Sequence, residues 1–258
     1  YRDAALRERV HARFDEVVMR GDIPVNLGVV ALVATAYLYT GEEKYKNWVV
    51  NYVEAWLERT EQNGGIIPDN IGLQGKIGEN RGGQWWGGFY GWTGRFSHQM
   101  MFSAMTVAAE CAQLITGERR YLSLLRSQLD MLLERAIEKD GRLLVPFKHT
   151  DAGWTDFHPM MPLAPIHLWV ASMADEDWVR LEKLRRSNEA EWRQVTSRGP
   201  RALDDRAWTR FLAGECPDYP EQILSANYRQ ICARVEQVMS DDSDLTKINE
   251  HHWQERNP

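Results

Sequence analysis

The chain has 258 residues, of which 43% are hydrophobic, 26% charged and 10% aromatic. These proportions are those of a folded globular protein and exclude a disordered, collagen-like or coiled-coil chain. No apolar run reaches the roughly 18 residues that a membrane-spanning helix needs. The formal net charge of −6 argues against a surface that binds duplex nucleic acid. We therefore expect neither a membrane nor a nucleic acid as partner.

Apolar residues at three- and four-residue spacing predict helices over 1–20, 25–40, 42–61, 96–116, 119–138, 160–174, 176–194, 204–213 and 220–240. The helix over 25–40 is apolar on every face, so we expect it to be buried all round. The helix over 42–61 has a single apolar stripe, so one of its faces meets water. Fully buried helices that alternate with half-buried ones predict two concentric layers.

A repeat supports this arrangement. Thr40-Gly41-Glu42 with Tyr45 recurs as Thr116-Gly117-Glu118 with Tyr121, 76 residues later, and the segment from Gly214 to Tyr219 resembles a degenerate third copy. Each copy is a helical hairpin in which glycine ends the first helix. The predicted fold is all-α, with hairpin repeats forming an incomplete (α/α) toroid as one domain over 1–258. Because the chain starts inside a helical pattern and ends without a stop signal, we expect truncation at both ends and leave localisation open.

Two segments outside the helices, 62–95 and 139–159, each follow the second helix of a repeat copy. Equivalent connections lie at the same end of a toroid, so we expect these two loops to meet over one mouth. Long loops of this kind in a compact domain are usually functional.

The first loop is unusual in composition. It holds 11 of the 19 glycines of the chain between residues 64 and 94, and three of the 11 tryptophans, Trp85, Trp86 and Trp92. Aromatic rings between glycines can lie flat along a cleft and stack on sugars. The alternative is that these rings only anchor the loop. Arg81 or Arg95 is a candidate partner for a uronate carboxylate, because guanidinium binds carboxylate in a bidentate way; either is alternatively a solvated loop charge.

His98 lies in the first turn of the helix over 96–116, on the face that carries Met101, Phe102 and Met105. A histidine at the mouth of a barrel is placed to shuttle a proton, with Tyr90 as its partner acid. The alternative is a core histidine satisfied by one backbone carbonyl.

The second loop repeats this mixture on a smaller scale and is expected to complete the cleft, with His149, Trp154 and His158 as binding residues and Asp151 as a catalytic candidate. Its spacing matches no metal signature, and the three cysteines do not form a zinc motif or a disulfide scaffold. We therefore expect no metal and no cofactor.

The run Gly91-Trp92-Thr93-Gly94-Arg95, followed by a helix that ends at Thr116-Gly117-Glu118, resembles the pattern of (α/α)6-toroid carbohydrate enzymes, among them the unsaturated-glucuronyl hydrolases and related polysaccharide lyases. The resemblance covers the hairpins across 25–140 and implies a toroid and carbohydrate chemistry. The Arg-Gly-Gln turn of that pattern is replaced here by Arg95-Phe96-Ser97-His98. No catalytic aspartate is carried over.

The resemblance implies three reaction types: hydrolysis, β-elimination and sugar epimerisation. Hydrolysis needs an acid and a base that flank the bond, for which Asp69 and Asp151 or Asp156 are the candidates. β-Elimination needs a group that neutralises the uronate carboxylate, a base and an acid. Arg81, Asn70 or Asn80 is the candidate for neutralising the carboxylate, His98 for the base and Tyr90 for the acid. The sequence thus predicts an enzyme that cleaves glycosidic bonds of acidic oligo- or polysaccharides. The alternatives are a non-catalytic glycan-binding or scaffold toroid and a sugar epimerase.

Overall fold

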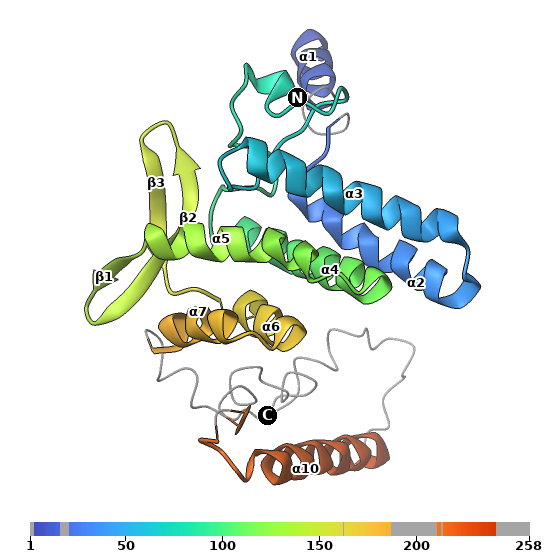
Figure 1. Cartoon of the computed structure of the whole chain (residues 1–258), viewed down its shortest axis with the longest axis vertical. Coiled ribbons are helices and arrows are strands. Elements are labelled where there is room, and N and C mark those ends of the chain that lie inside the picture. The colour runs from blue at the N-terminus through green and yellow to red at the C-terminus, as the bar shows by residue number, and fades with distance from the viewer. Residues whose placement is uncertain (1–2, 16–20, 162, 187–210, 213, 241–258) are drawn as a thin grey trace. The chain divides into compact units, whose positions relative to one another are not determined.

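The computed structural model describes residues 3–15, 21–161, 163–186, 211–212 and 214–240 (Figure 1). The chain divides into two compact units, Tyr1–Ser187 and Asn188–Pro258, where the sequence predicts a single domain. Each unit is described by itself. None of the helices within these ranges is long and apolar enough to cross a membrane.

The first unit is built mainly from helices. In chain order they are α1 (Ala4–Phe14), the 3-10 turn η2 (Pro24–Val29), α2 (Val30–Thr40), α3 (Glu43–Gln62), the 3-10 turn η3 (Glu79–Arg81), α4 (Arg95–Thr116), the 3-10 turn η4 (Arg119–Leu122), α5 (Ser123–Glu134), α6 (Leu163–Ser172) and α7 (Asp175–Arg186). Residues 1–2 and 16–20 of the helix predicted over 1–20, and residues 187–194 of the one predicted over 176–194, lie outside the described residues.

The repeat predicted from the sequence is confirmed at the turns between α2 and α3 and between α4 and η4. Gly41 and Gly117 adopt left-handed backbone angles, with φ of 67° and 77°, which glycine reaches without steric cost. Before each glycine a threonine hydroxyl donates to the carbonyl four residues earlier and accepts the N–H of the following glutamate, in Thr40 as in Thr116. The same local chemistry thus ends both helices.

The helices form two layers. In one layer α2 contacts α4 and α4 contacts α6, while in the other α3 contacts α5 and α5 contacts α7. Figure 1 shows the α4–α5 hairpin between the α2–α3 and α6–α7 hairpins. The prediction that α2 is buried all round is wrong, because Leu32 and Leu38 are 72% and 60% exposed. Among the described residues, only one side of α2 has packing partners, and it buries Val30 and Ala34.

A small sheet corrects the all-α prediction. The helix predicted over 119–138 ends at Glu134, and β1 (Ile137–Lys139), β2 (Arg142–Thr150) and β3 (Gly153–His158) form an antiparallel sheet in the order β1–β2–β3. Asp140 and Gly141 both have positive φ, 53° and 71°, as a two-residue hairpin turn requires. The first unit is thus mostly helical, with one three-stranded sheet that packs on α4 and α5.

The core of the first unit joins the helices to the loops. Trp56 of α3, Met101 and Met105 of α4, and Leu125 of α5 are fully buried in one cluster with Trp92 and Phe147, which belong to the two loop segments. The loops are therefore fixed to the helical layers rather than free above them.

The second unit contains α10 (Tyr219–Ser240). Tyr219 and Ile223 at its start pack against Phe211 and Cys216. Gly214, from the degenerate repeat copy, has a φ of 78°, similar to Gly41 and Gly117. Most of the helix predicted over 204–213 lies outside the described residues.

Candidate functional site

The two loops meet, as the sequence predicts. Thr93 and Lys148 form an antiparallel bridge, and the His149 N–H donates to the Trp92 carbonyl at 3.0 Å. The rings of Trp92 and Trp154 meet edge to face at 5.1 Å. The glycine-rich loop and the β2–β3 hairpin therefore form one continuous surface.

Asp69 organises the glycine-rich loop. Its carboxylate is fully buried and accepts hydrogen bonds from the backbone N–H groups of Gly87, Gly88 and Trp92, at 2.9, 2.7 and 3.0 Å. A Cβ atom at Gly88 or Gly91 would overlap Asp69, so the chain passes close to this carboxylate only because glycine stands at both positions.

This position corrects the expectation that Asp69 is a catalytic acid. Burial raises the pKa of Asp69, while hydrogen bonds from Asn70, Gly88, Trp92 and Gly87 oppose that rise. The carboxylate has no exposed surface with which to meet a substrate. Asn70, which donates to Asp69 at 3.1 Å and to the Gln84 carbonyl at 3.0 Å, is likewise part of the loop scaffold.

His98 is also sealed from solvent. Its ring stacks on Phe147 at 3.9 Å and on Phe102 at 4.4 Å, and Trp92 meets it edge to face at 6.0 Å. Neither ring nitrogen has a hydrogen-bond partner among the described residues, and burial lowers the pKa of His98 to about 3. In this conformation His98 cannot exchange a proton with a ligand, so the expected proton shuttle is corrected to a neutral core imidazole. The backbone-carbonyl partner of the alternative interpretation is likewise not seen.

The other residues expected in the first loop are dispersed. Tyr90, with a φ of 54°, packs on Phe89 at 4.2 Å and on Phe96 at 5.9 Å. Arg95 is exposed in the first turn of α4. The Arg81 Nε is buried without a partner in the described part of the chain, and the Asn80 carbonyl accepts from Arg13 at 3.1 Å.

A second group of aromatic side chains does come together. The His149 ring lies 4.7 Å from Trp85, 4.7 Å from Trp86 and 4.8 Å from Trp154, and all four side chains are partly exposed. We call these four residues the tryptophan cluster. Trp92, by contrast, is fully buried and donates its ring N–H to the Ile67 carbonyl at 2.9 Å. Of the tryptophans predicted to bind a ligand, Trp92 is therefore a packing residue.

Electrostatics at the cluster favour a neutral His149. Burial lowers the pKa of His149, the positive charge of Arg135 lowers it further, and Asp151 opposes both. The Nδ1 atom is buried and finds no partner within the described ranges, which leaves Nε2 as the nitrogen that can meet a ligand. The Arg135 guanidinium lies 5.9 Å from the Trp154 ring. The cluster thus combines aromatic faces with a nearby cation.

A hydrogen-bonded pair lies further along β3. The His158 Nε2 is 2.8 Å from the Asp156 Oδ1, and both side chains are more than one-third exposed, at 38% and 36%. Asp151 is exposed in the turn that joins β2 to β3. The sequence predicts His158 as a binding residue, but nothing in it distinguishes Asp156 from Asp151, because the left-handed backbone at Asp156 has no sequence signal.

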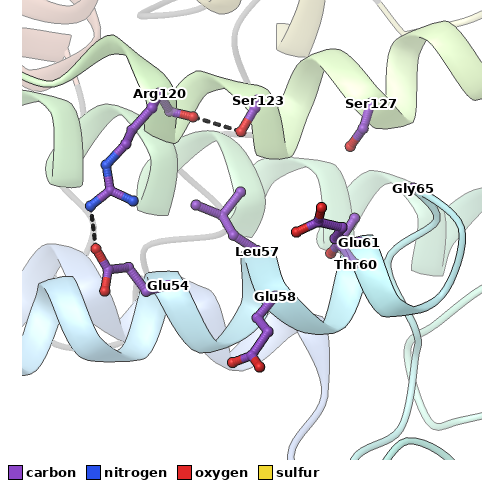
Figure 2. Close-up of a pocket in the computed structure, with 9 residues that line it drawn as sticks. All are labelled: Glu54, Leu57, Glu58, Thr60, Glu61, Gly65, Arg120, Ser123 and Ser127. Carbon is purple, nitrogen blue, oxygen red and sulfur yellow. Dashed lines mark hydrogen bonds and ion pairs between the residues drawn. The ribbon is translucent and has the colours of Figure 1, made fainter.

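A separate cleft of about 680 Å³ lies between α3 and the η4–α5 segment. Figure 2 shows Glu54, Glu58 and Glu61 on the α3 side and Arg120, Ser123 and Ser127 on the other. Glu54 and Arg120 form an ion pair across it. None of the residues that the sequence singled out lines this cleft. Across the described ranges, no group of three His, Cys, Asp or Glu side chains is placed to hold a metal ion.

The fold and the site together define a protein of layered helical hairpins whose loops carry a partly exposed tryptophan cluster. The chain belongs to the family described as a domain of unknown function (DUF8034), whose model matches residues 1–144 and 137–258. No curated protein and no solved structure matches the chain.

Proposed function

We propose that this protein is a carbohydrate-active enzyme that binds uronate-containing oligo- or polysaccharides at the tryptophan cluster and cleaves their glycosidic bonds, with β-elimination favoured over hydrolysis. The observation that carries the proposal is the convergence of two loops, from successive helical hairpins, on three partly exposed tryptophans. Indole faces of this kind stack on the apolar faces of sugar rings.

The charges near the cluster support an anionic ligand. Arg135 lies beside Trp154, Lys148 is exposed next to His149, and Arg81 lies beside Gly87, the residue after Trp86. Guanidinium groups bind carboxylates in a planar, bidentate way, as a uronate would need.

The distribution of carboxylates favours elimination. Hydrolysis by the usual route needs two carboxyl groups that flank the scissile bond. Asp69 is enclosed by the loop, and Asp156 is paired with His158. β-Elimination needs a base and a cation instead, and partly exposed histidines and arginines are what the loops present.

The two helical layers support a further part of the proposal, that the hairpins belong to an (α/α) toroid with the tryptophan cluster at its mouth. The repeated turns at Gly41 and Gly117 and the order α2, α4, α6 within one layer are what successive hairpins of a toroid require.

A non-catalytic glycan-binding protein is the second candidate. The burial of both Asp69 and His98 favours it, because these were the strongest acid–base candidates from the sequence. Binding would then occur at the same cluster without any bond cleavage.

Titration of the whole chain with oligouronates, followed by tryptophan fluorescence, tests the proposed site. Trp85→Ala and Trp86→Ala should each weaken binding about tenfold, because one lost stacking contact is worth about 1.4 kcal/mol. Trp48→Ala is the matched control, since Trp48 is 41% exposed on α3 and stacks on Tyr52 rather than on a loop residue. Equal affinity of Trp85→Ala and Trp48→Ala would refute the site, and an unsaturated product would separate the enzyme from the binding protein.

A further inference from the structure

His158 lies on β3 four residues after Trp154, its ring is 5.4 Å from that of Phe147, which stands two residues before His149 on β2, and its hydrogen bond at 2.8 Å holds Asp156 beside it. In the register of the sheet, Trp154 pairs with His149 and His158 pairs with Val145. The pair is therefore on the face that carries the tryptophan cluster, further along the strand.

The backbone at Asp156 is unusual. Its φ of 60° is left-handed, which is rare for a residue with a side chain, and it interrupts an otherwise regular strand pairing between positions 153 and 158. Such strained positions persist only where the surroundings hold them, and they concentrate at functional sites. The strain turns Asp156 toward Gly94, where a Cβ atom would lie 3.5 Å from the Asp156 Oδ2.

Gly94 is the N-cap of α4, a helix of 22 residues to which no described side chain gives a capping hydrogen bond. The Asp156 carboxylate therefore lies at the end of α4 where the first backbone N–H groups have no partner within the helix. On the other side, the Phe147 ring lies 5.4 Å from the His158 ring and limits its movement. The pair is thus held by the helix, by β2 and by its own hydrogen bond while remaining open to solvent.

We propose that Asp156 and His158 are the proton-accepting pair of the site, and that the substrate is an oligosaccharide long enough to reach from the tryptophan cluster to this pair. This inference rests on the proposed function and adds catalytic residues and a minimum substrate length to it. Four residues of strand separate Trp154 from His158, which is about 13 Å at about 3.3 Å per residue. One sugar unit does not span that length.

The chemistry follows from the hydrogen bond. With its Nε2–H donated to the Asp156 Oδ1, His158 has a free electron pair on Nδ1. Nδ1 takes the proton from the carbon that bears the uronate carboxylate. The electron pair of that C–H bond forms a carbon–carbon double bond as the bond to the glycosidic oxygen breaks. The imidazolium then gives its proton to the departing oxygen, so the step balances without any co-reactant. Asp156 compensates the transient positive charge, and Arg95, exposed directly after Gly94, supplies a charge for the carboxylate.

Steady-state kinetics on oligouronates of increasing length tests the assignment. His158→Gln should lower kcat at least about 100-fold with little change in KM, since general base catalysis contributes about that much or more. Asp156→Asn should lower kcat and shift the pH dependence of kcat, whereas a merely structural role would not move that profile. Oligouronate affinity should be unchanged in both variants. His11→Gln, on the exposed face of α1, is the matched control and should cleave like the wild type.

The possible results separate three proposals: the proton-accepting pair, the binding site and the minimum substrate length. Wild-type cleavage that persists in both His158→Gln and Asp156→Asn would overturn the pair while the proposed function stands. Binding of oligouronates by the wild type without an unsaturated product would overturn the proton-accepting role and leave the binding site in place. Monosaccharide glycosides cleaved as fast as longer chains would overturn the length requirement. Loss of kcat with retained affinity in both variants supports the pair.

Discussion

His98→Leu replaces a buried imidazole with an apolar side chain of similar size, and its effect on stability should depend strongly on pH. In the folded protein the stack on Phe102 and Phe147 and the absence of a hydrogen-bond partner in the described residues disfavour the charged ring, so the pKa of His98 falls from 6.5 to about 3. The unfolded chain binds this proton at its ordinary pKa. The stabilising contribution of a neutral His98 is therefore complete above about pH 6.5 and is lost as the pH falls toward 3.

The size of the change in unfolding free energy follows from the pKa shift of His98. Each pH unit inside this window costs about 1.4 kcal/mol, so at pH 4 the wild type has lost about 3 kcal/mol through His98 alone. The leucine variant does not lose this contribution. At pH 7 the two proteins should differ by less, about 1 kcal/mol, because leucine removes two unpaired buried nitrogens but also loses ring stacking.

Urea unfolding followed by tryptophan fluorescence at pH 7, 5.5 and 4 measures the difference. Carboxylates and His149 titrate in both proteins, so their contributions cancel in the comparison. We expect the curves of unfolding free energy against pH to diverge below pH 6.5, with the variant gaining about 3 kcal/mol relative to the wild type between pH 7 and pH 4. Parallel curves would refute the burial of a neutral His98 in the folded state.

Three further predictions, two for the glycine-rich loop and one for the packing of α5 on α7, can be checked by the same unfolding assay. Asp69→Asn should cost about 3 kcal/mol, because an amide cannot accept from three backbone N–H groups as the carboxylate does; a loss below 1 kcal/mol would contradict the anchoring role. Gly91→Ala should cost about 2–3 kcal/mol because its Cβ overlaps Asp69, whereas Gly28→Ala, whose Cβ would lie 4.0 Å from that of Ala104, should cost little; equal effects would show that the loop is not held closely. Asp177→Asn, on α7, should cost about 3 kcal/mol, since Asp177 is buried and accepts from both Arg126 of α5 and Arg180 at 2.7 Å, and an unchanged unfolding free energy would contradict this ion-pair network.

The hairpins were predictable because the chemistry that ends their helices is local. The threonine, the glycine and the following glutamate at Thr40–Glu42 and Thr116–Glu118 make their hydrogen bonds within a few residues of one another. The meeting of the two loops followed from this repeat, because equivalent connections emerge at the same end of equivalent hairpins.

The sheet was less predictable. The apolar pattern of α5 continues through Ala136 and Ile137, and only the turn at Asp140 and Gly141 shows that the chain reverses there as a β-hairpin. The exposure of Leu32 on α2 was also not predictable, because an apolar helix face gives no information on whether a neighbouring helix covers it.

Within the site, the sequence gives residue types but not burial. Trp85, Trp86 and Trp92 stand in the same glycine-rich run, yet only Trp92 is fully buried. Asp69 and His98 are chemically suitable catalysts, but the N–H groups and rings that enclose them come from positions distant in the chain. The pairing of Asp156 with His158 depends on one left-handed residue within a strand, for which the sequence provides no signal.

We propose above that this protein breaks a glycosidic bond beside a uronate at the surface formed by the two loops. The most direct measurement is to incubate the wild type with a defined oligouronate and weigh the products by mass spectrometry. β-Elimination predicts two fragments whose masses sum to that of the substrate, one of them carrying a conjugated double bond that absorbs in the ultraviolet, with formation strongly reduced in Trp85→Ala and retained in Trp48→Ala. Fragments that sum to the substrate plus one water would show hydrolysis instead, and an intact substrate across a range of uronate glycans would contradict the proposed cleavage.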